Sequence, residues 1–417
     1  MPKNSDLSSF NNVTCPFCSI HCDDLNIDVH DNKLEVKNDL LPDCKKRFEQ
    51  FNYNKNSNVD PKIKGKTVRH EDSIKKCKEL VKLSKEIIIS NSSADVNVVR
   101  ELLYSSSRMN AILDHVNSDI FLKNMSLFQR KGYISTTLSE IKNKSDVIIL
   151  FSNNILANYP RIIDRVLAVK NSFSTSNAKK KIFIIGNRKN NIKHRVKDDR
   201  ICYVDFNNKK IPELLESLKL NKNDINLKSS DFKILAPAVN KSKYLSIIWS
   251  TSEYIRYEFC QKIINSISQY VLDRNKSNRA ACLALSGNEG DVSSSQTTGW
   301  FTGFPVRVKF TGKYFEYDRD VYRSQALIKS GDSDLVIHIN SFSNKLIQIN
   351  KKVKNIVIGH PLTKYNYEPD VFIPCGVPGI DYQGLIFRTD NVVTLPLSSI
   401  RIPIHKSVQE IIREINK

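Results

Sequence analysis

The sequence is poor in glycine, methionine and tryptophan and contains no long hydrophobic run. Of its 417 residues, only 13 are glycine, 3 are methionine and 2 are tryptophan. No stretch approaches the roughly 20 consecutive apolar residues that a membrane helix needs. The polar residues 1–12 lack the apolar segment of a secretory signal. These absences exclude a collagen-like or membrane-embedded protein, and we expect a cytoplasmic protein with no membrane partner.

Several catalytic and nucleic-acid-binding motifs are also missing. There is no G-x-S-x-G nucleophile elbow and no P-loop, and Gly186-Asn187-Arg188 is too short for a dinucleotide fingerprint. Lys plus Arg is 64 and Asp plus Glu is 44, so the net charge is 64 − 44 = +20. Basic runs such as Lys179-Lys180-Lys181 adjoin apolar runs, which is typical of solvated element ends. We therefore expect no nucleic-acid partner, whereas an acidic partner or anionic substrate suits the charge.

Apolar runs rich in β-branched residues alternate along the chain with segments of helical periodicity. The run from Val147 to Phe151 is apolar at every position, which is typical of parallel strands covered on both faces. We therefore predict an α/β protein with two doubly wound α/β lobes. Strands are expected at 25–29, 86–91, 110–115, 146–151, 181–186, 201–206, 244–249, 281–285, 335–339, 355–358 and 370–373, and helices at 71–85, 94–105, 162–169, 211–218 and 253–271.

Polar segments suggest where the domains end. Residues 1–12 are expected to be a polar tail, and polar stretches at 52–66 and 222–233 are expected to be linkers. These boundaries predict three parts, namely a small cysteine-rich N-terminal segment with its linker at 1–66 and two α/β domains at 67–233 and 234–417.

Polar turns follow five of the predicted strands. Ligands of doubly wound sheets bind outside the carboxyl ends of the strands, so these turns are candidate functional positions, with ordinary solvated turns as the alternative. Of the nearby histidines, we interpret His338 and His360 as structural. The five turns are Ser152-Asn153-Asn154, Ser250-Thr251-Ser252, Ser286-Gly287-Asn288-Glu289-Gly290, Asn340-Ser341 and Gly359-His360.

Four of the nine cysteines form a motif near the N-terminus. Their spacing is C-x2-C-x3-C-x21-C, and it differs from the paired C-x2-C of a zinc ribbon. Four thiolates suit a [4Fe–4S] cluster or tetrahedral zinc, and bare thiols are the third reading. His21 lies inside the motif and is interpreted as a solvent-facing turn residue, with metal ligation as the alternative. The predicted metal ligands are Cys15, Cys18, Cys22 and Cys44.

Three segments together carry a resemblance to a known family. The order of the three segments along the chain resembles that in the B-type subunit of formylmethanofuran dehydrogenase, of the molybdopterin oxidoreductase superfamily. The similarity looks greatest to the B-type subunit of the formyltransferase/hydrolase complex of methylotrophic bacteria. The segments are the cysteine motif from Cys15 to Leu25, the stretch from Gln296 to Val308, and the stretch from Asp370 to Gly384 with Phe387-Arg388-Thr389-Asp390.

The resemblance implies a molybdopterin-oxidoreductase-like fold and a role in C1 metabolism linked to tetrahydromethanopterin. In the dehydrogenase, the B-type subunit carries a [4Fe–4S] cluster and molybdenum or tungsten on two molybdopterin guanine dinucleotides, and it interconverts formate and carbon dioxide. In the methylotroph complex, a formyl group is transferred and hydrolysed to formate without a redox metal. The implied partners are amidohydrolase-like and formyltransferase-type subunits.

The sequence departs from the redox-active family at one decisive place. A redox-active B-type subunit needs a metal-bound Cys or selenocysteine followed by His, and alignment places these near Ile120 and Phe121. No residue from Met109 to Lys131 is a cysteine. Ser118 or Asp119 are alternative ligands, but turn or capping roles suit them better. A soft metal without its thiolate lacks a principal protein ligand, so we expect that the pterin–metal site is lost.

Three functions follow from these observations. The first is a scaffold, the B-type subunit of a formyltransferase/hydrolase complex without the pterin-metal thiolate. The second is a redox-active subunit with a bis-pterin molybdenum or tungsten centre that converts formate and carbon dioxide. The third is an interaction protein stapled by zinc. Metal content distinguishes them, because they predict iron alone, iron with molybdenum or tungsten, and zinc.

Overall fold

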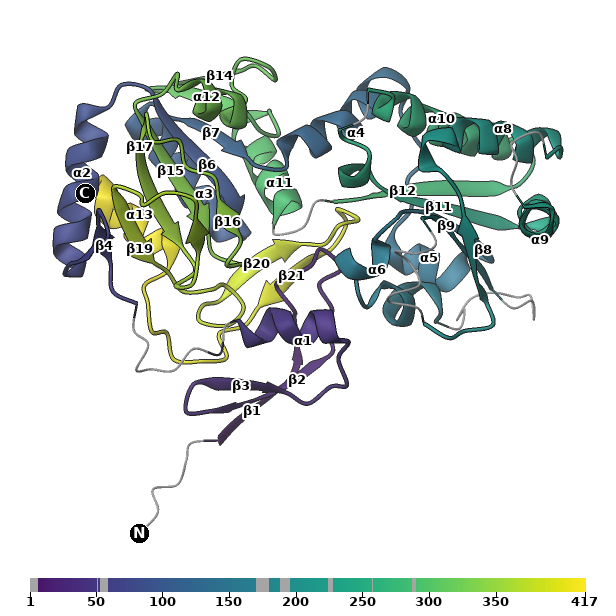
Figure 1. The fold of residues 1–417 in the computed structure, drawn as a ribbon, viewed down its shortest axis with the longest axis horizontal. Helices are drawn as coiled ribbons and strands as arrows, with labels where there is room; N and C mark the ends of the chain where they lie inside the picture. The colour runs from purple at the N-terminus through teal and green to yellow at the C-terminus, as the bar shows by residue number, and fades with distance from the viewer. Residues whose placement is uncertain are drawn as a thin grey trace, which may run out of the picture. The chain divides into compact units, whose positions relative to one another are not determined.

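A computed structural model of the chain describes residues 7–50, 52, 59–169, 180–187, 196–223, 228–256, 258–286 and 290–417. It is a mixed α/β structure, as predicted, and it divides into two compact units (Figure 1). Unit 1 comprises Met1–Ser118 and Asn288–Lys417, and unit 2 comprises Asp119–Gly287. Unit 2 is therefore an insertion within unit 1. This division differs from the predicted domain boundaries after residues 66 and 233.

The described part of unit 1 contains a sheet of nine strands in the order β14-β13-β7-β6-β15-β17-β19-β4-β5. Its five central strands are parallel, and the outer strands at both edges are antiparallel. The pairing of β6 with β15 joins residues about 250 positions apart, which is why chain order misled the predicted boundaries. The strands are β4 (Lys62–Ile63), β5 (Lys66–Thr67), β6 (Ile87–Ser93), β7 (Ile112–His115), β13 (Val308–Thr311), β14 (Tyr314–Tyr317), β15 (Leu335–Asn340), β17 (Lys354–Gly359) and β19 (Val371–Pro374).

Both faces of this sheet are buried, because alternate side chains of its strands enter different apolar clusters. In β6, Ile87 and Ile89 pack in the cluster that contains residues of α2, α3 and α13, whereas Ile88 packs in another with residues of α12. The helices of unit 1 are α1 (Pro42–Glu49), α2 (His70–Leu83), α3 (Val96–Met109), α11 (Asp291–Thr302), α12 (Ser324–Ser330) and α13 (Val408–Asn416).

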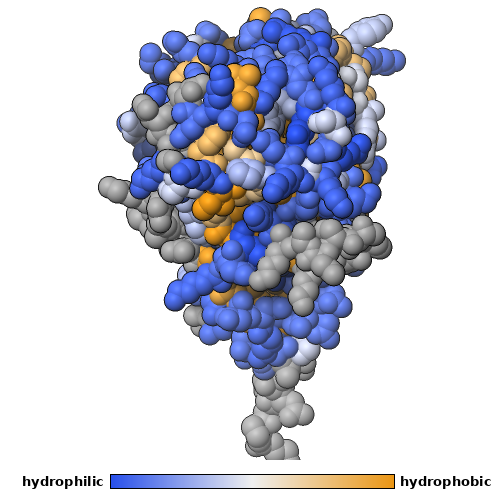
Figure 2. Space-filling model, turned by 90° about the vertical axis from the view of Figure 1, so that its right-hand side faces the viewer, coloured by the Kyte–Doolittle hydropathy of each residue, from blue (hydrophilic) through white to orange (hydrophobic). Residues whose placement is uncertain are grey.

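The described part of unit 2 contains a parallel sheet of five strands in the order β10-β9-β8-β11-β12. The strand order reverses between β8 and β11. Figure 2 views the molecule from the side on which α8 and α9 lie in Figure 1, and the surface there is mostly hydrophilic around a central apolar area. The strands are β8 (Val147–Phe151), β9 (Lys181–Gly186), β10 (Ile201–Asp205), β11 (Tyr244–Ser250) and β12 (Arg279–Leu285).

The described helices of unit 2 depart from prediction at several places, and those at 118–131, 138–144 and 155–158 were not predicted at all. The predicted helix at 162–169 is a π-helix, the predicted linker at 222–233 includes the start of α9, and the predicted helix at 253–271 starts later, at α10. The helices are α4 (Ser118–Lys131, which begins at the last residue of unit 1), α5 (Leu138–Lys144), α6 (Ile155–Asn158), the π-helix η2 (Ile163–Leu167), α8 (Ile211–Leu220), α9 (Ser229–Lys241) and α10 (Cys260–Arg274), with short 3-10 turns η3 (Asn208–Lys210) and η4 (Thr251–Glu253).

The N-terminal residues form a three-stranded antiparallel sheet, β1 (Leu7–Val13), β2 (Leu25–His30) and β3 (Lys33–Val36). For residues 7–12 the prediction of a polar tail was wrong, because β1 pairs with β2 through backbone groups that hydropathy does not report. Residues 1–6 lie outside the described residues. Two short strand pairs complete unit 1, β16 (Leu346–Ile347) with β18 (Lys364–Tyr365) and β20 (Gly384–Phe387) with β21 (Thr394–Leu397). None of the helices in the described ranges has the length and apolar character of a membrane span.

Candidate functional site: a cysteine loop and the carboxyl ends of two sheets

The three clustered cysteines lie on the loop between β1 and β2, and Cys44 lies on α1. The Cys15 backbone N–H donates to the Cys22 carbonyl oxygen at 2.7 Å, and the His21 N–H donates to the Cys18 carbonyl oxygen at 2.9 Å. These bonds fold the loop back on itself. Cys18 and Cys22 are buried, whereas Cys15 and Cys44 are half-buried, and none of the four forms a disulfide bond.

Electrostatics shows that three of the thiols are neighbours. Burial, and then the nearby thiols of Cys18 and Cys44, raise the pKa of Cys15, while Arg47 and a backbone hydrogen bond to Phe17 oppose the rise. The described residues nevertheless include no group of three or more His, Cys, Asp or Glu side chains positioned to hold a metal ion. The fold thus brings the predicted ligands into one region without converging them on a point.

His21 is buried, so the prediction that it faces solvent was wrong. Its φ of +45° is in the left-handed region, which turns the loop between Cys18 and Cys22. The ring Nδ1 lies 3.0 Å from the Cys15 carbonyl oxygen. Burial, opposed by that contact, lowers the pKa of His21 to about 4, so the ring is neutral at pH 7. The residue supports the loop from inside.

The hairpin of β20 and β21 supports the cysteine loop from the rest of unit 1. The Thr389 N–H donates to the Ser19 carbonyl oxygen at 2.8 Å. Gly379 has a φ of +85°, and a Cβ atom there would lie 3.2 Å from Pro16. On the other side of the loop, the rings of Phe17 and Phe48 pack edge to face, with centroids 4.8 Å apart. The loop is therefore built into the core of unit 1.

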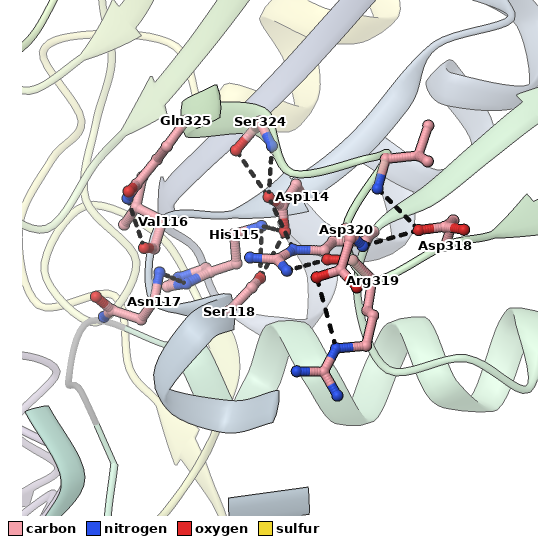
Figure 3. A network of polar contacts seen from close by, with 12 residues as sticks. Asp114, His115, Val116, Asn117, Ser118, Asp318, Arg319, Asp320, Ser324 and Gln325 are labelled. Carbon is pink, nitrogen blue, oxygen red and sulfur yellow. Dashed lines mark hydrogen bonds and ion pairs between the residues drawn. The ribbon is translucent and has the colours of Figure 1, made fainter. Parts of the chain in front are cut away.

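A second region of interest is the end of β7, directly before the segment to which the missing thiolate was aligned. Asp114 is buried there and takes part in a network of polar contacts (Figure 3). Its Oδ1 accepts the Ser118 hydroxyl at 2.5 Å, and its Oδ2 accepts the Ser324 hydroxyl at 2.8 Å. Arg307 is also buried, and its Nε lies 3.6 Å from Asp114 Oδ2. Burial raises the pKa of Asp114, and the guanidinium opposes that rise.

These contacts bear on whether Ser118 and Asp119, the alternative ligands suggested by the sequence, suit a metal ion. Ser118 is bonded to Asp114 and so serves the structural role that the sequence analysis preferred for it. Asp119, Ile120 and Phe121 lie in the first turn of α4, and the two apolar side chains are half-buried. The residues present therefore do not fit a soft metal that requires a thiolate.

His115, the last residue of β7, is a further polar residue that the sequence analysis missed. Its Nδ1 accepts the Asn117 backbone N–H at 3.0 Å, which places the ring proton on Nε2. Nε2 is buried and finds no hydrogen-bond partner among the described residues. Burial lowers the pKa of His115 to about 3, so the ring is neutral. The only sequence signal was an acid and a histidine ending an apolar strand.

The five polar strand ends fall into two sets. The turns after β8, β11 and β12 lie at the carboxyl edge of the sheet in unit 2, and those after β15 and β17 lie at the carboxyl edge of the sheet in unit 1. Of the turn after β12, residues 287–289 lie outside the described residues. The sequence placed the five turns correctly at strand ends, but it did not show that two sheets divide them.

Glu253 organises the strand ends of unit 2, and the sequence analysis missed it. Its Oε2 accepts the Asn153 backbone N–H at 2.5 Å, its Oε1 accepts that of Asn154 at 3.4 Å, and it also bonds the Ser152 hydroxyl. Burial raises its pKa, and these three donors oppose the rise. The carboxylate thus joins the turn after β8 to the turn after β11, where the strand order reverses.

The two histidines of unit 1 discussed above have structural surroundings. His338 lies on β15, and its Nε2 is 3.1 Å from Asn355 Oδ1. The Nδ1 of His360 accepts the Leu362 N–H at 2.9 Å. Burial lowers the pKa of each to about 4, so both rings are neutral at pH 7. This agrees with their interpretation as structural residues.

Comparison with known proteins finds relatives along nearly the whole chain. Two curated proteins, each named as the B-type subunit of a tungsten-containing formylmethanofuran dehydrogenase 2, are 22% identical to it. The protein from Methanococcus maripaludis aligns over 410 residues, 92% of each chain, and that from Methanocaldococcus jannaschii over 397 residues, 91% of each. No family model matches the chain.

A solved structure supports the same resemblance at the level of the fold. A chain in the crystal structure of the formyltransferase/hydrolase complex (FhcABCD) from Methylorubrum extorquens, in complex with methylofuran, superposes with a TM-score of 0.68 and 19% identity. The match covers 85% of this chain and 97% of that one. The resemblance predicted from the three motifs is therefore confirmed: the chain is similar over almost its whole length to proteins named as B-type subunits of formylmethanofuran dehydrogenase.

Proposed function

We propose that the chain is the B-type subunit of a formyltransferase/hydrolase complex in tetrahydromethanopterin-linked C1 metabolism, and that it acts as a scaffold without its own pterin–metal centre. The observation that carries this proposal is the hydrogen bond of 2.5 Å that the Ser118 hydroxyl donates to Asp114 Oδ1 at the end of β7. The segment that contains Ser118 has no cysteine. The similarity to the B-type dehydrogenase subunits and to a chain of the FhcABCD complex supports the choice of complex.

The fold proposed for this subunit is that of a molybdopterin oxidoreductase with two doubly wound lobes. The parallel five-stranded sheet of unit 2, with its reversal between β8 and β11, supports this fold, as do the parallel central strands of unit 1. At the reversal in unit 2, where such sheets bind ligands, Glu253 bonds the backbone N–H groups of Asn153 and Asn154. Those donors are satisfied within the chain.

The cysteine loop is proposed to hold a [4Fe–4S] cluster through Cys15, Cys18, Cys22 and Cys44. Support comes from the proximity of the Cys15, Cys18 and Cys44 thiols and from the buried loop that carries Cys22. When bound, a cluster of this kind supplies a one-electron redox centre. Without a second redox centre in the chain, its role in this subunit is structural. His21 and the hairpin of β20 and β21 then keep the loop in the shape that presents the thiols.

The proposed partners are the amidohydrolase-like and formyltransferase-type subunits of the complex, in which the formyl chemistry takes place. The excess of 64 basic over 44 acidic residues supports association with acidic protein surfaces. A redox-active subunit remains the second candidate, because the curated relatives are named as tungsten-containing dehydrogenase subunits.

Elemental analysis of the anaerobically purified complex, with an assay for released pterin, separates the two candidates. The scaffold proposal predicts about four iron atoms per chain, as a [4Fe–4S] cluster contains, with no molybdenum, tungsten or pterin. Molybdenum or tungsten at about one atom per chain would overturn it and would require a ligand other than Ser118. Zinc at about one atom per chain would instead support the third hypothesis, a zinc-stapled interaction protein.

A further inference from the structure

In unit 1, α3, α11 and β20 pack together (Figure 1), and exposed aromatic side chains lie on these elements. Trp300 and Phe301, at the end of α11, are 64% and 40% exposed, and Tyr104 on α3 is 52% exposed. The rings of Tyr104 and Phe301 pack edge to face with centroids 5.6 Å apart. Leu385 on β20 is 41% exposed. We call these four residues the aromatic patch.

Hydrogen bonds and a ring contact hold together the elements that carry the aromatic patch. The Leu385 N–H donates to the buried carboxylate of Asp95, the N-cap of α3, at 3.3 Å. The Phe387 N–H donates to the Ser293 hydroxyl of α11 at 2.9 Å. Trp300 packs edge to face on Phe387, with centroids 5.3 Å apart. The rings are therefore preorganised and would lose little conformational freedom on binding.

Two arginines border the patch along one face of α3. Arg100, Tyr104 and Arg108 are spaced four residues apart, so they form a single exposed stripe of the helix. Within the described ranges neither guanidinium has a hydrogen-bond or ion-pair partner. On the buried side of α3, by contrast, Glu101 is paired with Arg413 at 2.7 Å. The stripe therefore presents positive charge that no described residue neutralises.

We propose that the aromatic patch, with Arg100 and Arg108, is the docking surface for an acidic partner protein, and specifically for another subunit of the complex. The inference rests on the proposed function and identifies where the assembly contact forms. Trp, Tyr and Arg are the residues that dominate binding energy at protein interfaces. An apolar centre with charged side chains at its border is the usual composition of such a surface.

The positive charge beside the aromatic patch favours a different protein as the binding partner over a second copy of this chain. In a symmetric pair the same patch meets itself, so the two arginines of each copy would face those of the other. Each chain also carries a net charge of +20. Carboxylates on a partner would satisfy both guanidinium groups. A nucleic acid is a weaker fit, because the patch includes the aliphatic Leu385 and offers two cations in place of a basic track.

The test measures assembly of the full chain with the co-expressed amidohydrolase-like and formyltransferase-type subunits of the same organism. Two double variants are compared with the natural chain, Tyr104→Ala with Trp300→Ala, and Arg100→Glu with Arg108→Glu. A matched control changes an exposed cation and an exposed apolar side chain outside the patch, Lys82→Glu with Leu83→Ala on α2. Thermal unfolding of each variant checks that it is folded.

We expect each patch variant to raise the Kd for the partner subunits by about 30-fold or more, and the control to change it by less than about threefold. Binding should also weaken as salt is added. If the natural chain assembles and the patch variants bind equally well, the docking site is wrong but the proposed function stands. If the natural chain does not assemble at all, both are overturned.

Two further measurements test the alternative partners of the aromatic patch, which are a second copy of the chain and a nucleic acid. Dimerisation of the natural chain alone, lost in the Trp300 variant, would assign the patch to a second copy. Binding of a single-stranded RNA oligonucleotide that the Arg100 variant abolishes would assign it to nucleic acid. Either result would overturn the proposal of an acidic protein partner.

Discussion

The cysteine loop and the end of β7 are the two regions that the sequence analysis considered for a metal, and they differ in the side chains that they offer as ligands. The loop and α1 together contribute four cysteines, and the thiols of Cys18 and Cys44 lie close enough to Cys15 to raise its pKa. At the end of β7 there is no thiol, and the polar side chains are bonded to one another around Asp114 and Arg307.

The two regions differ in how their polar groups are used. Buried polar groups without partners are costly. At the end of β7 the Asp114 carboxylate accepts two serine hydroxyls and forms an ion pair with Arg307, whereas Nε2 of His115 has no hydrogen-bond partner among the described residues. In the cysteine loop, backbone hydrogen bonds fold the chain back on itself. Four predictions test this contrast.

The largest expected effect concerns the cysteine loop. Replacement of Cys15 by Ser should reduce the iron content of anaerobically purified protein from about four atoms per chain to nearly none, because an alcohol is a poor cluster ligand. Cys202→Ser, in β10 of unit 2, is the control and should retain the iron. Iron analysis and the visible absorption of the cluster measure the result. Equal iron in both variants would remove Cys15 from the ligand set.

The second prediction concerns the buried ion pair at the end of β7. Asp114→Ala should lower the free energy of unfolding by about 3–5 kcal/mol, because it leaves the buried Arg307 guanidinium without its counter-charge. Asp320→Ala removes an exposed carboxylate 3.7 Å from Arg319 and should cost less than about 1 kcal/mol. Urea unfolding measures both. Similar losses for the two would mean that the network is not what stabilises this region.

The third prediction concerns Asp95, which links α3 to the hairpin that supports the cysteine loop. Burial raises the pKa of Asp95 to about 6, above its ordinary value of 3.8, against the hydrogen bonds it accepts. The folded chain therefore holds this proton more tightly than the unfolded chain, and stability falls as pH rises from about 4 to 6. Asp95→Asn keeps the cap and should remove about 2–3 kcal/mol of that decline.

The comparison for Asp95 requires unfolding curves of both proteins at several pH values. The natural chain should lose stability relative to Asp95→Asn between pH 4 and pH 7. A constant difference across this range would contradict the effect of burial on Asp95.

The smallest expected effect concerns Ser118. Ser118→Ala removes the hydroxyl that donates to Asp114 at 2.5 Å and should cost about 1–2 kcal/mol, since the carboxylate loses one of several donors. Ser330→Ala, which removes an exposed hydroxyl, should change stability by less than about 0.5 kcal/mol. An unchanged unfolding midpoint for Ser118→Ala would leave Ser118 available as a ligand.

Much of the fold was predictable from local pattern. The strand from Lys181 to Gly186 was predicted with its observed bounds, and β8, β11, β15 and β17 were predicted to within one or two residues. Such strands are buried on both faces, so hydropathy reports them directly. The polar strand β1 was missed because its pairing uses backbone groups. α11 was missed because its sequence has no apolar periodicity.

The candidate sites were predictable only in part. The four cysteines were identified by type and spacing, and the absence of a cysteine near Ile120 by alignment. Asp114, Arg307 and Glu253 were not identified, because their partners are far away in the sequence. Arg307 lies 193 positions from Asp114 (307 − 114), and Glu253 lies 100 positions from Asn153.

The sequence by itself determined the chemistry that is possible, namely four thiols near the N-terminus, none near Ile120, and β-branched strands that must be buried on both faces. These properties depend on residue type and local spacing. Only the tertiary structure decided which residues share a site. Strand pairing across about 250 residues makes unit 2 an insertion within unit 1. The same long-range packing places Arg307 against Asp114, because a buried charge requires a partner that local sequence does not specify.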